Sequence, residues 1–355
     1  MAFIRHVVTP ISKVCNLMKN DRVLDAMQLT SGSRLAFLDA KGTLKVLGDF
    51  GTDRDYMPNF RKLMENGGGG HLMVSVKGGN TANTEFEFLS GDSMAFLPSG
   101  SVVYQQFIRD NIPVLPSYLA GIGYSTTAIH PYLSSGWDRY RVYPLLGFED
   151  FLSQDDFTDP QKMRLYISDE SAFEKIIEQY ESRKNEQEPQ FIFEVTMQNH
   201  SGYSKDYPGF TEEIHLTGTN YENTQTRAVE KYMTLIYESD KALGNLMSYF
   251  TQVDEPVIII MFGDHQPSDY ITNVIDRMVG YDPESSIEEA QKSYIVPYFV
   301  WNNFDMDFTA PELVSTNYLA ADILDAAGLP LTTWHEFLLD LQKQIPVICA
   351  GAYVD

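Results

Sequence analysis

Cysteine is nearly absent from this sequence. The 355 residues include only two, Cys15 and Cys349. Neither belongs to a CxxC pair or to a Cys/His pattern with zinc-binding spacing, which argues against thiol redox chemistry and against a structural zinc site. Because the two cysteines lie so far apart in the sequence, they also say little about the redox compartment of the protein.

Basic residues are scarce as well. The chain has 26 Lys and Arg against 49 Asp and Glu, a formal net charge of −23. Such an acidic surface repels nucleic acid and anionic membranes, which excludes a protein that binds nucleic acid by neutralising its backbone. An anionic substrate would need a strong local positive charge to overcome this field, and a bound metal ion is the usual source of one.

Long apolar runs are missing. No run reaches the ~18 residues that a bilayer-spanning helix needs. The N-terminal stretch MAFIRHVVTPISKVC lacks an uninterrupted apolar core that ends in small residues, so it does not predict a signal peptide. The chain as written is therefore expected to be soluble, with no transmembrane segment. The G-x-S-x-G and phosphate-loop motifs are also absent, which argues against a Ser/His/Asp hydrolase and against nucleotide binding.

The composition that is present, 43% hydrophobic and 21% charged, is typical of a globular protein with a sizeable core. Short apolar runs, rich in β-branched and aromatic residues, alternate with amphipathic helical patterns. The main predicted strands are 34–39, 71–76, 124–130, 191–200, 256–265 and 294–301, and the clearest predicted helices are 168–180, 230–250 and 315–328. This alternation predicts an α/β fold with a central, mostly parallel sheet flanked by helices.

Chemically active side chains stand at the ends of several predicted strands: Asp39, His130, His200, Asp264 and His265. Each has a simple structural alternative as a turn or strand-end residue. In open α/β sheets, however, ligands bind beyond the carboxyl ends of the strands, so we expect these side chains to meet at one edge. A carboxylate beside an imidazole is a common ligand pair for a divalent ion.

Thr81 follows the predicted strand 71–76 and a Gly-Gly-Asn turn. Helix capping is the simplest explanation for a threonine here, but Thr84 with Glu87 fits the S/T-x-x-E capping box and is the better predicted cap. Backbone N–H groups exposed by Gly78 and Gly79 suit an anion. A hydroxyl at this position, if bound to a metal ion, would lose its proton more easily and could attack phosphorus.

Four motifs occur in order along the chain: GGNTANTEFEFLSG (78–91), WDRY (137–140), MQNHSGY (197–203) and MFGDHQPS (261–268). Together they resemble the lipoteichoic acid synthase / phosphoglycerol transferase branch of the alkaline phosphatase–sulfatase superfamily. The resemblance covers roughly residues 35–345 and is specific as a combination of motifs. It implies transfer of glycerol phosphate from phosphatidylglycerol through a covalent threonine intermediate.

The resemblance also implies one bound divalent ion, for which Mn²⁺ is the leading choice and Mg²⁺ or Zn²⁺ are alternatives. It further implies roles for individual residues. Asp39 stands where the family has a glutamate ligand. The implied set is Thr81 as nucleophile and metal ligand, Asp39, Asp264 and His265 as metal ligands, His200 as a catalytic and substrate-binding residue, and Arg139, Trp137 and His130 as substrate-binding residues.

The expected organisation is a lead-in segment (1–34), a sulfatase-like catalytic domain (35–290) and a small C-terminal part that completes the domain (291–355). The resemblance implies a phosphatidylglycerol-type lipid head group as donor and a glycan or polyglycerolphosphate as acceptor. It also implies that the full-length protein works at the extracytoplasmic face of a bacterial cell membrane. No obligate protein partner and no nucleic-acid partner is predicted.

Two alternatives stay open at this point. One is a related phosphotransferase or phosphatase, for example a phosphoethanolamine transferase. The other is a metal-poor relative that binds glycerophosphate or wall glycans without catalysis, which the aspartate at position 39 and the neighbouring Lys41 favour.

Overall fold

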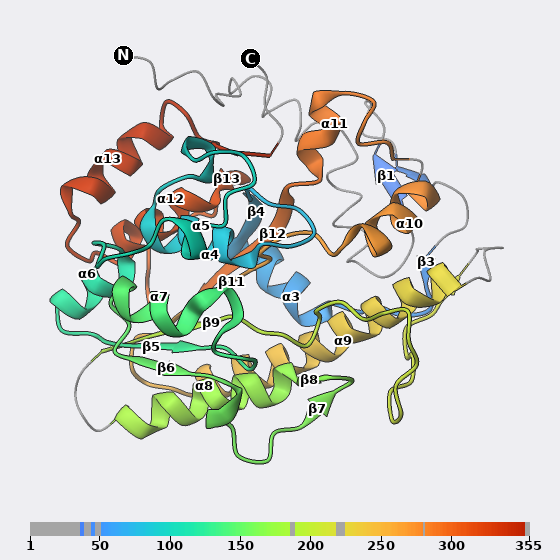
Figure 1. Ribbon diagram of the computed structural model, residues 1–355, viewed down its shortest axis with the longest axis horizontal. Helices are drawn as coiled ribbons and strands as arrows, with labels where there is room; N and C mark the ends of the chain where they lie inside the picture. The colour runs from blue at the N-terminus through green and yellow to red at the C-terminus, as the bar shows by residue number, and fades with distance from the viewer. Residues whose placement is uncertain are drawn as a thin grey trace.

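The computed structural model describes residues 36–38, 44–46, 51–184, 189–217, 224–279 and 281–351. Asp39, and with it the prediction that Asp39 is a metal ligand, lies outside the described residues. The predicted α/β class is confirmed, since strands and helices alternate along the chain (Figure 1). Among the described helices, none combines the length and the apolar character needed to cross a bilayer.

Two sheets form the centre of the fold. The larger has the order β11-β12-β4-β13 and consists of β4 (Gly69–Met73), β11 (Ile258–Phe262), β12 (Ile295–Asn302) and β13 (Leu313–Ser315). The smaller has the order β6-β5-β9, is parallel throughout and consists of β5 (Ser125–Ile129), β6 (Asp150–Leu152) and β9 (Gln190–Glu194). In the larger sheet β13 runs parallel to β4, whereas β12 runs antiparallel to both of its neighbours.

Three small antiparallel pairs lie outside these sheets. They are β1 (Ala36–Leu38) with β2 (Leu44–Val46), β3 (Gly51–Thr52) with β10 (Leu216–Thr217), and β7 (Lys162–Met163) with β8 (Tyr166–Ile167).

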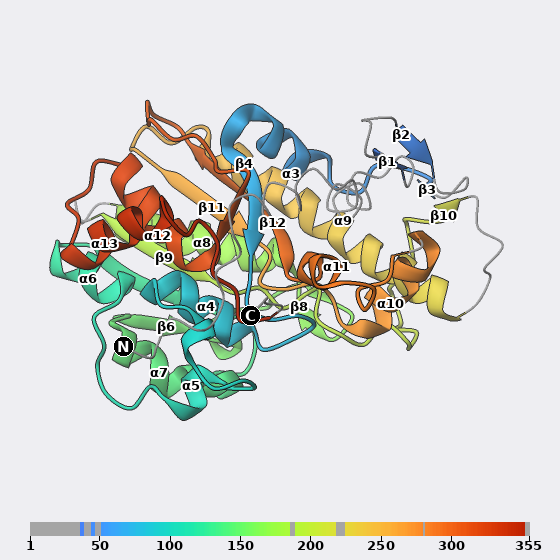
Figure 2. The ribbon, with the colours of Figure 1, turned by 90° about the horizontal axis from the view of Figure 1, so that it is seen from above.

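Helices cover both faces of the central sheets (Figures 1 and 2). The α-helices are α3 (Pro58–Leu63), α4 (Thr81–Ser90), α5 (Val103–Gln106), α6 (Leu115–Gly121), α7 (Arg139–Leu146), α8 (Asp169–Arg183), α9 (Thr224–Phe250), α10 (Asp269–Val279), α11 (Ile287–Lys292), α12 (Thr316–Ala326) and α13 (Thr333–Gln342). Short helical turns are η1 (Met64–Gly68), η2 (Met94–Phe96), η3 (Gly136–Asp138) and η4 (Gln154–Asp156).

The alternation of side chains along β11 shows why both sheet faces must be covered. Ile258, Ile260 and Phe262 pack against the core cluster that includes α4 and α12, whereas Ile259 and Met261 pack against the cluster formed with α3, α8 and α9. A strand that is apolar on both faces can be buried only between two layers of helices. The sequence pattern of β11 therefore requires the three-layer arrangement.

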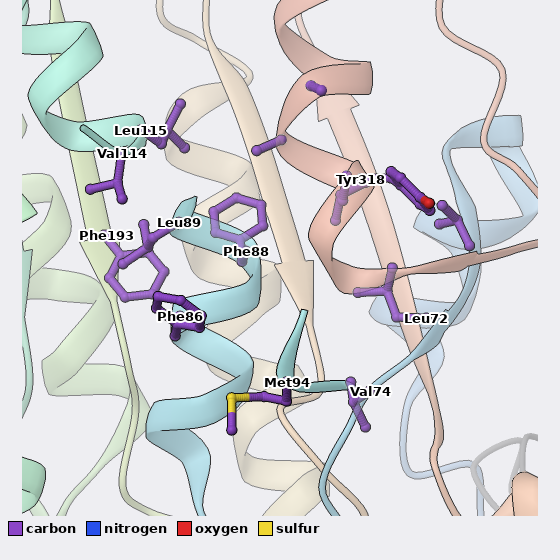
Figure 3. Packing of buried hydrophobic residues seen from close by; sticks show 14 of the residues in the cluster. Leu72, Val74, Phe86, Phe88, Leu89, Met94, Val114, Leu115, Phe193 and Tyr318 are labelled. Atoms are coloured by element: carbon purple, nitrogen blue, oxygen red, sulfur yellow. The ribbon is translucent and has the colours of Figure 1, made fainter. Parts of the chain in front are cut away.

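Helix α4 packs across both sheets. The ring of Phe88 lies 5.1 Å from that of Phe262 on β11 and 6.1 Å from that of Phe193 on β9, measured between centroids. Figure 3 shows Phe86 and Leu89 of the same helix turned toward Phe193. Because large buried side chains each contribute about 1.5–3 kcal/mol, this packing fixes the position of α4 and of its first residue, Thr81.

Glu87 holds α4 to β4 from inside the core. Its Oε1 accepts hydrogen bonds from the Ser75 hydroxyl (2.6 Å), the Ser93 hydroxyl (3.1 Å) and the Met94 backbone N–H (2.9 Å). The predicted capping box of Thr84 and Glu87 is therefore wrong. Helix α4 begins at Thr81, so Thr84 is buried inside it and the Glu87 carboxylate does not cap its start.

Other helix starts follow the sequence signals. Ser168 accepts from the Ser171 backbone N–H at the start of α8, as the predicted Ser-Asp start implies. Gly328, predicted to end the helix 315–328, has a φ of +67° just beyond α12. Strand β12 departs from the predicted parallel arrangement, and it lies between β11 and β4.

We expect the buried Glu87 to make stability depend on pH. Burial raises the pKa of Glu87 from its usual 4.5 to about 7, although its hydrogen bonds oppose this. Between these two values the folded protein holds a proton that the unfolded chain releases, so the free energy of unfolding falls as pH rises through this window and levels off above it. Glutamine does not ionise, so the Glu87→Gln variant should not lose stability in this way. Relative to wild type, we expect its free energy of unfolding to rise by up to about 3 kcal/mol between pH 5 and 8.

Urea denaturation at pH 5, 6, 7 and 8 measures this difference. The control is Glu178→Gln on α8, where the side chain is 68% exposed. If the difference in the free energy of unfolding between Glu87→Gln and wild type stays the same at all four pH values, the account is contradicted.

Candidate active site

A tight turn delivers Thr81 to the start of α4. Gly78, Gly79 and Asn80 have φ angles of +69°, +159° and +64°, which glycine adopts freely and asparagine tolerates better than most residues. The Thr81 hydroxyl does not cap the helix. It donates instead to Asp264 Oδ2 at 2.6 Å, across a separation of 183 residues.

Asp264 and His265 follow β11 and face Thr81. His265 Nε2 lies 3.1 Å from Asp264 Oδ2 and 3.3 Å from Thr81 Oγ1. His265 Nδ1 lies 2.6 Å from the carbonyl oxygen of Gln266, an acceptor, so Nδ1 carries the proton of the neutral ring. The lone pair on Nε2 is therefore directed toward the threonine and the aspartate. The Thr84 hydroxyl fixes the same segment by donating to the Asp264 carbonyl oxygen at 2.7 Å.

These three side chains fit a divalent metal ion. Thr81 Oγ1, Asp264 Oδ2 and His265 Nε2 lie 2.6–3.3 Å from one another. A hydroxyl, a carboxylate and a neutral imidazole are all ligands that Mn²⁺ or Zn²⁺ accepts, and the two oxygens also suit Mg²⁺. Within the described ranges no group of three or more His, Cys, Asp or Glu is placed to hold a metal ion, and the third potential donor beside Asp264 and His265 is the Thr81 hydroxyl.

His200 lies close to this group. Burial lowers the pKa of His200, and the nearby His265 and Arg164 lower it further while Asp264 opposes them. The Tyr166 and Ser201 hydroxyls lie 3.2 Å and 3.3 Å from Nδ1. When both donate to Nδ1, the proton of the neutral ring is on Nε2.

His130 follows β5 and is almost fully buried, at 3% exposure. Its Nδ1 lies 2.7 Å from the carbonyl oxygen of Val195, and burial together with the nearby Arg139 lowers the pKa of His130 to about 4. His130 is therefore neutral at physiological pH.

Trp137 and Asp138 both have left-handed backbone conformations, with φ of 54° and 60°. Each such residue costs about 1–3 kcal/mol, and strain of this kind tends to cluster at functional sites. The two residues lie in η3 and lead directly into α7. Trp137 packs partly against the main core cluster, so its ring is only partly available to a ligand.

Arg139 occupies the interior rather than the surface, at 2% exposure. Its guanidinium forms an ion pair with Glu85 through Nη2, and its Nε lies 3.3 Å from Glu85 Oε2. Tyr143 donates to the same carboxylate at 2.8 Å. The Arg139 guanidinium, predicted to bind substrate, is directed in this structure to Glu85.

Glu85 was missed by the sequence analysis. It stands one helical turn after Thr81 on α4, and its pairing joins α4 to α7 across 54 residues. Its place in TANTEFEF, among phenylalanines, is a signal that could have suggested burial, and both Glu85 and Glu87 are buried in the structure.

The comparisons with known proteins identify the class. The sulfatase family model matches residues 45–329, so the chain belongs to the sulfatase family. This confirms the superfamily that the four motifs indicated.

Among curated proteins, a putative cyclic β-1,2-glucan modification protein of Rhizobium meliloti is 33% identical over 280 residues, which cover 77% of this chain and 42% of that protein. The chain thus spans less than half of the length of this relative.

Two solved structures share the fold. The phosphoglycerol transferase GacH of Streptococcus pyogenes, in complex with sn-glycerol-1-phosphate, has a TM-score of 0.69 and 24% identity over 84% of this chain and 75% of that one. The lipoteichoic acid synthase LtaP of Listeria monocytogenes has a TM-score of 0.63 and 18% identity over 78% of this chain and 67% of that one.

We expect the Glu85–Arg139 pair to be essential for stability. Glu85→Ala leaves a buried guanidinium without its carboxylate, which costs about 3–5 kcal/mol of unfolding free energy. Chemical denaturation measures the loss. The control is Asp340→Ala, which breaks an exposed pair with Lys343 and should change stability little. A Glu85→Ala protein within about 1 kcal/mol of wild type would show that the pair is not needed.

Proposed function

We propose that this protein is a metal-dependent phosphoglycerol transferase in which Thr81 takes glycerol phosphate from a phosphatidylglycerol-type lipid. The observation that carries the proposal is the hydrogen bond of the Thr81 hydroxyl to Asp264, with His265 Nε2 at 3.3 Å. A threonine hydroxyl directed at a carboxylate and an imidazole, at the start of a helix, is an activated nucleophile rather than a cap. The similarity in fold to GacH supports the choice of glycerol phosphate as the transferred group.

Thr81, Asp264 and His265 would hold a divalent ion, most consistent with Mn²⁺ and with Mg²⁺ or Zn²⁺ as alternatives, and Asp39 is the proposed fourth ligand. When bound, the ion would stabilise negative charge on the phosphoryl oxygens and lower the pKa of the Thr81 hydroxyl.

In the first half-reaction Thr81 Oγ1 forms a bond to phosphorus as the bond from phosphorus to the diacylglycerol oxygen breaks. The Thr81 proton moves along its hydrogen bond to Asp264 Oδ2. His200, in its protonated form, donates the Nε2 proton to the departing diacylglycerol oxygen, which leaves as an alcohol while the ring becomes neutral. The neutral His200 is then ready to act as a base and returns to its protonated form in the second half-reaction.

In the second half-reaction a hydroxyl of the acceptor attacks the phosphothreonine. His200 Nε2 accepts the proton of that hydroxyl, and Thr81 Oγ1 leaves and recovers its own proton from Asp264. Water in place of the acceptor gives hydrolysis. The buried Arg139–Glu85 pair has a positioning role, because it holds α7 and the Trp137 turn against α4.

The acceptor is proposed to be a glycan or a polyglycerolphosphate, and the place of action the extracytoplasmic face of a bacterial cell membrane. The relative named for glucan modification and the lipoteichoic acid synthase fold support an envelope polymer as acceptor.

Replacement of Thr81 tests the nucleophile. With a fluorescent phosphatidylglycerol and Mn²⁺, Thr81→Ala should lose at least about 1,000-fold in diacylglycerol release, because the attacking oxygen is gone. Thr81→Ser keeps the hydroxyl and should retain measurable activity. Thr251→Ala, which removes a hydroxyl bonded within α9, is the control. Undiminished release by Thr81→Ala would refute the role, and faster release from phosphatidylethanolamine would assign the chain to phosphoethanolamine transfer.

Metal binding is tested separately by thermal melting. Titration with MnCl₂ should raise the melting temperature of wild type, since a ligand at 100 times its dissociation constant adds about 2.7 kcal/mol. Asp264→Asn removes a carboxylate ligand and should lose most of this increase, while the exposed Asp340→Asn should keep it. Equal increases in wild type and Asp264→Asn would mean that the ion binds elsewhere.

A further inference from the structure

A group of tyrosines is connected to His200 through ring contacts and through Arg164, and we call it the tyrosine cluster: Tyr132, Tyr166, Tyr203 and Tyr207. The rings of Tyr132 and Tyr166 lie 5.7 Å apart, and Tyr166 lies 5.7 Å from the ring of His200, all between centroids. Tyr132 in turn lies 6.2 Å from His130. An edge-to-face row of aromatic rings therefore runs from one predicted substrate histidine to the other.

Arg164 holds the cluster together from the turn between β7 and β8. Its guanidinium carbon lies 6.0 Å, 5.3 Å and 5.7 Å from the ring centroids of Tyr166, Tyr203 and Tyr207. Its Nη2 also donates to the carbonyl oxygens of Gln198 and His200, at 2.9 Å and 2.8 Å. The side chain thus fixes the rings relative to the segment that presents His200.

The rings differ in what they offer to a ligand. Tyr203 is buried, and its hydroxyl donates a hydrogen bond to the Asn199 carbonyl oxygen. Tyr132, Tyr166 and Tyr207 are only half-buried. The hydroxyls of Tyr132 and Tyr207 have no hydrogen-bond partner among the residues that the structure describes. These partly exposed rings, two of which have hydroxyls without a partner among the described residues, form a surface that a ligand can occupy.

The cluster also adjoins the reacting atoms. The Tyr166 hydroxyl lies 3.2 Å from His200 Nδ1, on the ring whose other nitrogen is proposed to take the proton of the acceptor hydroxyl. A molecule that rests on the Tyr166 ring would therefore lie beside His200.

We propose that Tyr132, Tyr166 and Tyr207 form the acceptor subsite, and that the acceptor is a neutral sugar of a glycan. The inference rests on the proposed function and names the acceptor class for the same site. Sugar rings have apolar C–H faces that pack on the electron-rich faces of aromatic rings, and their equatorial hydroxyls can bond to the phenolic hydroxyls.

Charge and polarity favour a sugar over the other candidates. A polyglycerolphosphate carries one negative charge per unit, whereas the chain carries a net charge of −23. The Arg164 guanidinium offers such a ligand little, because its Nη2 donates to two carbonyl oxygens and its Nε and Nη1 are buried from solvent. An acyl chain would need a continuous apolar surface. The loop between Tyr203 and Tyr207 instead consists of exposed polar residues, Ser204, Lys205 and Asp206.

Direct binding tests the subsite without turnover. In the Thr81→Ala background, saturation-transfer NMR would measure the affinity for a neutral glucotetraose, a glycerol phosphate tetramer, and vesicles of phosphatidylglycerol and phosphatidylcholine. We expect glucotetraose to bind, and Tyr132→Ala and Tyr207→Ala each to weaken it about tenfold. Tyr249→Ala is the matched control, because Tyr249 is also half-buried and packs edge-on to another tyrosine, Tyr180, at the end of α9.

Tyr132→Phe and Tyr207→Phe keep the ring and remove the hydroxyl, so they should weaken binding about threefold and decide the matter should an alanine variant not fold. The proposal is overturned if wild-type affinity survives in all four variants or if glucotetraose does not bind. It is also overturned if the substitutions weaken only the phosphate tetramer or only the vesicles. If the Tyr variants lose glucotetraose while the Thr81-intact protein releases no diacylglycerol, the subsite stands and the proposed function fails.

Discussion

The hydrogen bond between the Thr81 hydroxyl and Asp264 is the contact on which the rest of the site depends. It joins the start of α4 to the end of β11, segments 183 residues apart in sequence. Two buried carboxylates hold α4 in register for it, since Glu87 ties the helix to β4 and Glu85 ties it to α7. Because both carboxylates are inside the protein and partnered, the helix cannot shift without leaving a buried polar group unsatisfied.

The fold class and the central group of site residues could be predicted from the sequence, because both follow from short-range patterns. Thr81, Asp264 and His265 were found by assuming that the carboxyl ends of neighbouring strands share one edge. The structure places the three within hydrogen-bonding distance of one another. The α/β class followed from apolar runs that fit a sheet covered on both faces. Their chemical roles stay predictions, as does that of Asp39, outside the described residues.

The rest depended on long-range partners that no local pattern encodes. Strand β12 is apolar on both faces, and such a strand has the same pattern in either direction, so its antiparallel pairing was not foreseen. Thr84 matches a capping box, but tertiary burial overrides that signal. Arg139 was predicted to bind substrate, because nothing near it in the sequence indicates its buried partner Glu85, which is 54 residues away. Arg164 is a single arginine in a hairpin turn, and only the folded chain surrounds it with tyrosines.

The central claim is that Thr81 becomes covalently attached to the transferred group. Rapid mixing of the Mn²⁺-loaded protein with phosphatidylglycerol, acid quenching and peptide mass spectrometry would test it most directly. The account predicts that the peptide containing Thr81 gains the mass of one phosphoglycerol group, and that the adduct disappears when acceptor is added. Steady diacylglycerol release with no adduct on Thr81, or with the adduct on another residue, would contradict it.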